Sequence, residues 1–425
     1  MGNNTNNSID YLSSLKYPDF LKMWLAGLFA GSSHWALIVV RGWVVYQISD
    51  SSTYVGLVTF AALIPMVIVN PFIGYLADKF QRRRILQIMF FINFAHNFGL
   101  AFLYFLDLIV PWHLVILAFI QGSARASQMP SGQALVPNIV PQKNLLNAVA
   151  LNASTIHATR LLGPLAIAPF ISYIDSNERS IDGTDIAFFI CTAFYLLSFI
   201  FSMMIQNKST GKINSESFFK GFAEGVSYVH SNKPILIIII ITTLHCMLTM
   251  SFESILPYFS VNKLGAEGPA LSFLMMCVGI GALNASVFLA GTSSEKLKGK
   301  LFYYFAILSG IAPLVLSFST NLLLSMFGTV LMGLGQAGFM IISQTLIQVL
   351  APDYIRGRIV GIYAMYAGGS MALFNFINGL LADLINPGYS LAVQGILFSL
   401  IVIIYRNQKV LRFIYSGKAN QLVKA

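Results

Sequence analysis

Long, continuous apolar runs fill most of this sequence, and they limit its possible folds more than any other feature. Twelve runs approach the ~20 residues that a helix needs to cross the hydrocarbon core of a bilayer. Strands of a membrane barrel would instead alternate apolar and polar side chains. We therefore predict an all-α polytopic membrane protein with twelve transmembrane helices. The predicted spans are residues 20–47, 54–76, 85–106, 112–133, 145–173, 186–205, 234–259, 269–290, 301–318, 322–350, 359–385 and 391–405.

The composition excludes a soluble protein. Charged residues make up 10% and apolar residues 56% of the chain, at a mean hydropathy of +0.72, whereas an ordinary soluble domain has roughly 25% charged residues. The three cysteines lie in apolar runs and are interpreted as small buried residues. We find no phosphate-binding loop, metal-ligand spacing or nucleophile–base arrangement in the sequence, so we predict neither an enzyme nor a cofactor.

One long polar interruption, residues 206–233, separates the predicted spans into six and six. We therefore expect an N-terminal six-helix bundle at 1–205, a cytoplasmic linker at 206–233, and a C-terminal six-helix bundle with a basic tail at 234–425. Within the linker, apolar residues recur at helical spacing from Phe218 to Val229. This pattern predicts an amphipathic helix that lies on the inner membrane surface.

Lysine and arginine residues lie mainly on one side of the predicted spans. Assigning the loops to alternate sides places 21 of the 26 with both termini and the linker, and only Arg179 and Lys263 on the opposite side. This asymmetry follows the positive-inside rule. We expect a multi-pass protein of the inner (cytoplasmic) membrane with both termini in the cytoplasm. The net charge of +10 then reflects orientation and gives no reason to expect a nucleic-acid partner.

Matching features recur at a spacing of slightly more than half the predicted helical region, as in a duplicated transporter. Gln133 at the end of the fourth span matches Gln344 at the end of the tenth, 211 residues later. The loops at 74–79 and 291–296 share the pattern Gly-x-x-x-acid-Lys. These matches predict that the two six-helix bundles are pseudo-symmetric.

Two motifs carry a family resemblance. The run Gly74-Tyr-Leu-Ala-Asp78-Lys79-Phe-Gln-Arg82-Arg83 resembles the signature loop between helices 2 and 3 of the major facilitator superfamily, with glutamine at a usual glycine position. The run Arg160-Leu-Leu-Gly163-Pro164 is similar to the Gly-Pro element of helix 5 in exporters of that superfamily, although the glycine pair expected after it is replaced by Ile-Ala.

Two further runs are similar to the branch that contains the enterobactin exporter and macrolide efflux proteins. They are Pro137-Asn-Ile-Val-Pro141 and the segment 348–358. The helix 4 arginine of proton-linked drug exporters would fall at Ala118, while Arg125 lies farther along the same predicted helix. The resemblance implies an exporter of a siderophore or a macrolide-like compound, and its proton coupling does not transfer directly from the motif.

The charged loops suggest a cytoplasmic gate. A carboxylate at a membrane edge can bond guanidinium groups or a helix N-terminus and release them when the two bundles rock apart. The alternative is that the nearby cations only enforce topology and contact lipid phosphate. The predicted gate residues are Gly74, Asp78, Lys79, Arg82, Arg83, Glu295 and Lys296.

Polar residues inside apolar spans are candidates for function, because they are expensive in lipid. They recur at helical spacing in four spans, numbered 1, 4, 7 and 10, which are the cavity-lining helices of the resembled superfamily. The predicted cavity residues are His34, Arg41, Gln121, Arg125, Gln128, Thr242, His245, Thr249, Glu253, Gln336, Ser343 and Gln344.

Three roles remain open for the pair Arg41 and Glu253, which lie at equivalent depths in spans 1 and 7. An ion pair between them would close an outer gate. Alternatively, Glu253 carries protons across the membrane, or both side chains extend to the lipid headgroups. For Arg160, a helix–helix contact competes with a role in ligand binding.

The sequence as a whole predicts a secondary transporter that works by alternating access. We expect an exporter of an amphipathic small molecule, with protons as the coupling ion, the lipid bilayer as its surroundings and a monomeric state. An importer on the same fold is the alternative, because the residues do not encode direction. A non-transporting membrane receptor is an alternative of another class.

Overall fold

The structure is a computed structural model, and it describes residues 12–69, 81–171, 183–207, 218–265, 268–292, 294–352 and 354–418. Within these ranges the chain is helical and forms no strand. The predicted all-α class is therefore confirmed.

The helices before residue 208 follow the predicted apolar runs closely. They are α1 (Pro18–Ser49), α2 (Ser52–Leu63), α3 (Pro65–Ile68), α5 (Arg82–Phe105), α6 (Pro111–Ile139), α7 (Leu145–Ile171) and α8 (Gly183–Met203). The later helices are α9 (Phe218–Ser231), α10 (Lys233–His245), α11 (Leu256–Tyr258), α12 (Gly268–Ala290), α13 (Glu295–Phe318), α14 (Leu322–Leu350), α15 (Arg356–Leu384), α16 (Pro387–Ile404) and α17 (Lys409–Tyr415).

Nine helices in the described ranges are long and apolar enough to cross a membrane. They are α1, α5, α8, α10 with the π-helical turn after it, α12, α13, α14, α15 and α16. The other three predicted spans fall on α2 and α3, on α6 and on α7. The count of twelve transmembrane helices in two symmetric bundles therefore stays a prediction.

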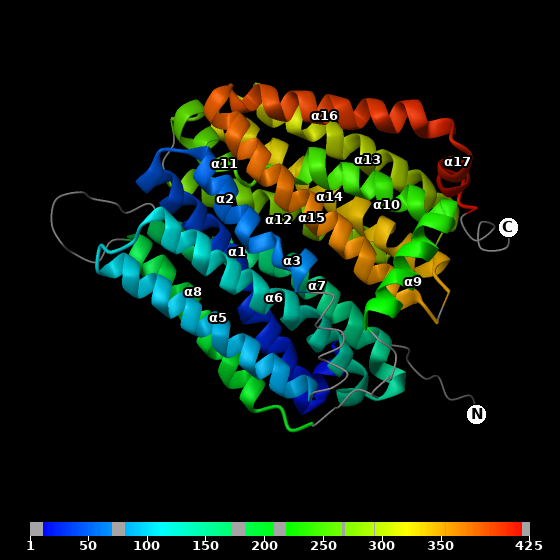
Figure 1. The fold of residues 1–425 in the computed structure, drawn as a ribbon, viewed down its shortest axis with the longest axis horizontal. Coiled ribbons are helices and arrows are strands. Elements are labelled where there is room, and N and C mark those ends of the chain that lie inside the picture. The colour runs from blue at the N-terminus through cyan, green and yellow to red at the C-terminus, as the bar shows by residue number, and fades with distance from the viewer. Residues whose placement is uncertain are drawn as a thin grey trace, which may run out of the picture.

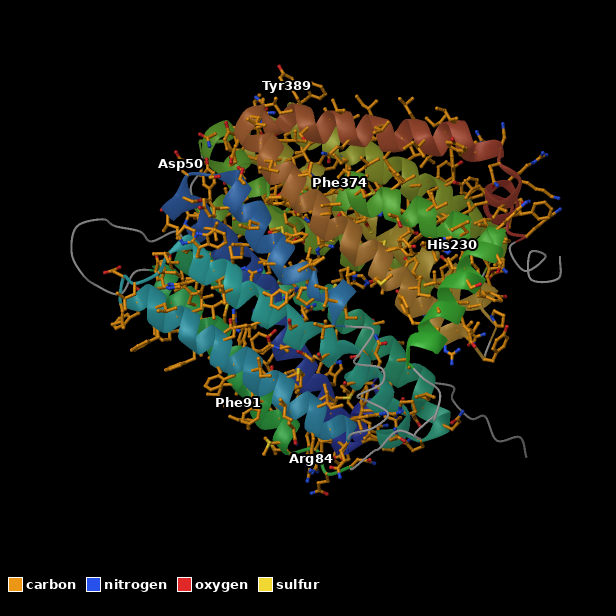
Figure 2. The ribbon with its side chains drawn as sticks, viewed as in Figure 1. Asp50, Arg84, Phe91, His230, Phe374 and Tyr389 are labelled. Atoms are coloured by element: carbon orange, nitrogen blue, oxygen red, sulfur yellow. The ribbon has the colours of Figure 1, made fainter. Side chains whose placement is uncertain are left out.

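The helices converge toward one end of the molecule and diverge toward the other (Figure 1). The convergent end holds α11, together with the last residues of α1 and α15. The divergent end holds α9 and α17. Figure 2 shows Asp50 at the convergent end, whereas Arg84 on α5 and His230 on α9 lie well apart at the divergent end.

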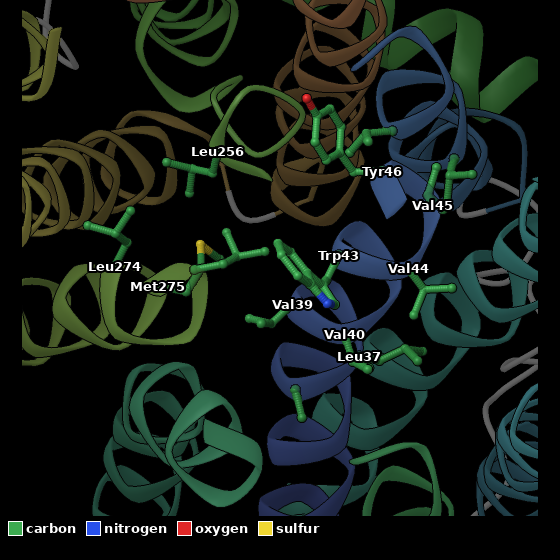
Figure 3. Close-up of a cluster of buried hydrophobic side chains, with 14 of the residues drawn as sticks. Leu37, Val39, Val40, Trp43, Val44, Val45, Tyr46, Leu256, Leu274 and Met275 are labelled. Atoms are coloured by element: carbon green, nitrogen blue, oxygen red, sulfur yellow. The ribbon is translucent and has the colours of Figure 1, made fainter. Parts of the chain in front are cut away.

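Buried apolar side chains form one shared core at the convergent end and two separate cores at the divergent end. The shared core joins Trp43 and its neighbours on α1 to Leu256 on α11 and to Leu274 on α12 (Figure 3). At the divergent end, one core around Phe20 lies within residues 12–207. The other, around Phe302, lies within residues 218–418. The two sequence halves are thus packed together at one end and have separate cores at the other.

Two helix pairs make most of the contact between the sequence halves, namely α2 with α15 and α7 with α12. Glycines allow both pairs to approach closely, as in other membrane bundles. A Cβ atom added to Gly379 on α15 would overlap the Ser52 carbonyl of α2, and one added to Gly279 on α12 would meet the backbone of Arg160 on α7. Side chains at these glycines would therefore force the halves apart.

The linker helix α9 docks on protein. Phe222, Val226 and Val229 pack against the core of the second half, and Glu224 accepts a 2.7 Å hydrogen bond from Arg358 on α15. The described part of its apolar stripe therefore packs on protein, and the position of this helix on the membrane surface stays a prediction. A stripe at helical spacing does not by itself distinguish lipid from a protein neighbour.

Candidate functional site

The seventh predicted span, 234–259, is not one regular helix. α10 ends at His245, a π-helical turn covers Cys246–Met250, and residues 251–255 form turns before α11. The prediction that Glu253 shares a helix face with His245 is therefore wrong, because the 3.6-residue period is interrupted between them. Glu253 lies on the unwound segment between α10 and α11.

Polar side chains from α15 and α16 hold this unwound segment. Asn375 accepts a 3.2 Å hydrogen bond from the Ser254 amide, and Asn378 donates to the Ser251 carbonyl. Gln394 on α16 donates to the Asn378 side-chain oxygen at 2.5 Å. These bonds satisfy backbone groups that a broken helix leaves without partners in an apolar interior. The sequence analysis missed all three residues, although Asn375 and Asn378 are polar residues three apart within an apolar span.

Three predicted cavity residues form one buried chain of hydrogen bonds. Arg41 Nη1 on α1 donates to Gln121 Oε1 on α6 at 3.3 Å, and Gln121 Nε2 lies 3.1 Å from His34 Nδ1. Arginine can only donate, so the Gln121 oxygen must face Arg41 and its NH₂ group must face His34. His34 Nδ1 therefore accepts, and the neutral ring carries its proton on Nε2.

Glu253 lies close to this chain without joining it. Arg41 and Glu253 are 4% and 8% exposed, and both line a small cavity of about 20 Å³ between α1 and α2. No salt bridge joins them and no hydrogen bond reaches the Glu253 carboxylate in the described part of the chain. Both Arg160 on α7 and Arg41 attract the Glu253 carboxylate electrostatically. The ion-pair closure is thus not formed in this conformation.

Arg160 lies at the contact between the sequence halves. Its guanidinium stacks over the Trp35 ring on α1, 4.7 Å from the ring centroid, and its Nε has no hydrogen-bond partner within the described ranges. Gly163, the next motif residue, packs against the α1 backbone at Ser32, and α7 continues through Pro164. The helix 5 motif thus brings α7 close to α1.

Arg125 faces a cleft that lies toward the divergent end. The cleft has a volume of about 100 Å³ and lies between α1, α5, α6 and α7. Its described lining residues are Met23, Gly27, Gly31, Trp35, Leu86, Phe90, Arg125, Gln128, Gly132, Gln133, Asn152, Thr155, Ile156 and Thr159. Gln128 Oε1 is buried there, and none of the described residues is its hydrogen-bond partner. Arg125 and Gln128 therefore line a cleft, and their place in a substrate cavity stays a prediction.

The polar residues of α10 and α14 instead bond to neighbouring helices. His245 Nε2 lies 2.8 Å from Ser309 Oγ on α13, Ser309 donates to Thr249 at 3.0 Å, and Thr249 donates to the His245 carbonyl. Gln336 donates to the Thr249 carbonyl at 2.7 Å. The Ser309 hydroxyl donates its hydrogen to Thr249, so His245 Nε2 must donate to Ser309 Oγ. A neutral His245 ring therefore carries its proton on Nε2.

The remaining predicted cavity residues are divided in the same way. Thr242 and Ser343 pair at 2.5 Å between α10 and α14, and Gln344 is exposed. Neither the pair nor the His245 network borders the clefts described above. Their contribution to a substrate cavity stays a prediction.

The predicted cytoplasmic gate lies only partly within the described residues. Gly74, Asp78 and Lys79 fall outside them, so the role of Asp78 in a cytoplasmic gate stays a prediction. Arg83 donates to the Ile205 carbonyl at 2.8 Å and thereby ties α5 to the end of α8. The matching carboxylate, Glu295, bonds Lys298 on its own helix at 2.9 Å, and Arg82 and Lys296 lie at the starts of α5 and α13.

A carboxylate that the sequence analysis missed joins the sequence halves at the convergent end. Asp383, near the end of α15, accepts hydrogen bonds from the Ser51 hydroxyl at 2.6 Å and the Ser52 amide at 2.7 Å. It also accepts from the Thr53 amide at 2.9 Å and the Thr53 hydroxyl at 2.6 Å. A carboxylate at a helix N-terminus is favourable because it satisfies free amides and complements the helix dipole. We call this contact the Asp383 latch.

Several known proteins are similar in sequence to this chain over most of its length. It is 24% identical to the staphyloferrin A transporter of Staphylococcus aureus, over 87% of this chain and 90% of that protein. It is 22% identical to the multidrug efflux pump Tap of Mycolicibacterium fortuitum, over 88% and 91%. It is 19% identical to macrolide efflux protein A of Streptococcus pyogenes, over 84% and 87%.

Solved transporter structures have the same fold. A D-xylose–proton symporter superposes with a TM-score of 0.71 at 16% identity, over 96% of this chain and 99% of that one. A POT family transporter superposes with a TM-score of 0.72 at 10% identity, over 92% and 96%. The profile of the transmembrane secretion effector family matches residues 9–420. The chain therefore belongs to the transmembrane secretion effector family of major facilitator superfamily transporters.

Proposed function

We propose that this protein is a proton-coupled secondary exporter that moves an amphipathic small molecule out of the cytoplasm by alternating access. The observation that carries the proposal is the polar cleft at Arg125, which lies toward the divergent end while a shared core and the Asp383 latch join the halves at the other end. A transporter that is open on one side only has this arrangement.

Orientation and direction follow from separate arguments. The positive-inside rule puts the linker and both termini in the cytoplasm, and the divergent end holds the linker helix α9. The described conformation is then inward-facing. The efflux names of two relatives favour export, and a siderophore or a macrolide-like compound is the substrate that the named relatives suggest. We infer twelve helices in two six-helix bundles and a monomer.

Substrate accumulation in inside-out membrane vesicles tests the exporter directly. We expect vesicles that contain the protein to accumulate radiolabelled staphyloferrin A or a radiolabelled macrolide when their lumen is acidified, and to lose it when the gradient is collapsed. Vesicles from cells without the protein are the control. Accumulation only in right-side-out vesicles would favour an importer, and binding without movement in either orientation would favour a receptor.

Glu253 is the proposed proton carrier, because it is buried, lies near two arginines and has no hydrogen-bond partner among the residues that the structure describes. We expect Glu253→Gln to fold normally and to lose gradient-driven accumulation by about tenfold or more, while exchange of substrate at equal pH is retained. Asp107→Asn removes an exposed carboxylate outside the predicted site and serves as the matched control. Gradient-driven transport by Glu253→Gln at the wild-type rate would exclude this role.

A further inference from the structure

We propose that the cleft at Arg125 binds an anionic head group, so that the transported molecule is an amphipathic carboxylate or a similar organic anion. This inference rests on the proposed transport function, and it assigns a charge to the substrate that neither the family match nor the fold supplies.

Positive charges outnumber negative ones inside the described membrane-spanning helices, and this excess favours a bound anion. Away from the helix ends, the described spans hold three arginines, Arg41, Arg125 and Arg160, and one carboxylate, Glu253. An arginine in a protein does not give up its proton, and His34 is already a neutral acceptor in its hydrogen-bonded chain. Glu253 balances one positive charge at most. An uncompensated charge in an apolar interior is costly, so a bound anion would stabilise the loaded protein.

Arg125 differs from the other two arginines in its surroundings. Arg41 is held by Gln121, and Arg160 is stacked on Trp35. Arg125 lines the open cleft, and no salt bridge to a described carboxylate engages it. Of the three arginines, Arg125 is the one that lines this cleft.

The side chains of the cleft wall suit an anion that also has an apolar part. Among the described residues that line it, none is an aspartate or a glutamate, so these side chains bring no negative charge against an anion. Gln128 carries a buried amide oxygen that has no partner in the described part of the chain, and a flip of that amide would turn its NH₂ group toward a bound carboxylate. Thr155 and Thr159 add hydroxyl donors, while Trp35 and Phe90 supply aromatic surface for an apolar part of the ligand.

The size of the cleft limits what it holds. Its volume of about 100 Å³ is well below the roughly 300–1,000 Å³ of sites that enclose a drug-sized ligand. The cleft therefore fits the charged head group, and the rest of the substrate would extend between the separate cores of the divergent end. A large molecule with one anionic end would satisfy this geometry.

The test is equilibrium binding to the full chain in phosphatidylcholine nanodiscs. The probes are 2-naphthoate, its uncharged analogue 2-naphthamide, and the cation 2-naphthylmethylammonium, measured by isothermal titration calorimetry. We expect naphthoate to bind at least about tenfold more tightly than either analogue. Arg125→Gln should remove this preference, while Arg125→Lys should retain most of it. Arg406→Gln, which removes an exposed arginine far from the cleft, should change nothing.

Each outcome bears on the proposal. Naphthoate that binds no better than naphthamide, or an anion preference that survives in Arg125→Gln, overturns it. If Arg125→Gln does not fold, the comparison of the three probes on the wild-type protein still decides. Proteoliposomes separate this inference from the proposed function. Transport of the cation or the amide in preference to the carboxylate overturns the anion site and leaves the exporter, whereas selective binding of naphthoate without any transport supports the site and contradicts the exporter.

Discussion

Replacing Asp383 with asparagine is expected to open the convergent end and to slow transport by about tenfold or more. The Asp383 carboxylate accepts four hydrogen bonds from residues 51–53 at the start of α2. An asparagine has one acceptor oxygen in place of two and no charge, and its NH₂ group would face donors. Allowing for solvent screening, we expect a loss of about 2 kcal/mol in the closed state, or about thirtyfold in the equilibrium constant between closed and open forms.

Thiol labelling measures this opening. Val55 on α2 is 2% exposed in the closed arrangement, so a Val55→Cys variant should react slowly with a membrane-impermeant maleimide and much faster when Asp383→Asn is added. The native cysteines at 191, 246 and 277 are buried. Asp107→Asn removes an exposed carboxylate near the same end and is the matched control. Equal labelling with and without Asp383→Asn would show that the latch does not hold the convergent end.

Gly281→Ala is expected to destabilise the protein strongly. A Cβ atom at Gly281 on α12 would overlap the Val330 carbonyl oxygen on α14, and one at Gly333 on α14 would overlap the Val278 carbonyl on α12. The two backbones touch, and neither can give way as a flexible side chain would. Overpacking of this kind costs about 1–3 kcal/mol or more, so we expect Tm to fall by about 5 °C.

Thermal unfolding in detergent, followed by circular dichroism, gives the Tm. Gly99→Ala introduces the same methyl group where no atom lies within 4 Å of the added Cβ, and it should leave Tm unchanged or raise it slightly because alanine favours helix. A Tm for Gly281→Ala equal to that of Gly99→Ala would contradict the close packing of α12 against α14.

Much of the fold could be predicted, because the dominant signal is local. An apolar run of spanning length forms a helix whatever its neighbours are, since lipid leaves backbone groups no other partner. The break after His245 is different. The run from Ile235 to Ile241 continues into it with no proline or glycine. The bonds that hold the unwound segment come from Asn375 and Asn378, more than a hundred residues away.

The candidate site could be predicted in part for the same reason. Helical spacing identified His34, Arg41 and Gln121, and the structure brings them into contact. Spacing also grouped His245 with Glu253, and here it failed because it assumes an unbroken helix. Asp383 gave no signal, because a single acidic residue at the end of an apolar run is indistinguishable from any loop charge until α2 is placed beside it.

Spin-label distances at both ends of the molecule test alternating access most directly. One pair, at Ile48 and Leu384, spans the convergent end, and another, at Arg84 and Tyr354, spans the divergent end; all four residues are exposed. Double electron–electron resonance in nanodiscs measures both distances, and we expect them to change in opposite directions between neutral and acidic pH. The Ile48–Leu384 distance should lengthen as the Arg84–Tyr354 distance shortens. Two ends that stay fixed, or that open together, would contradict it.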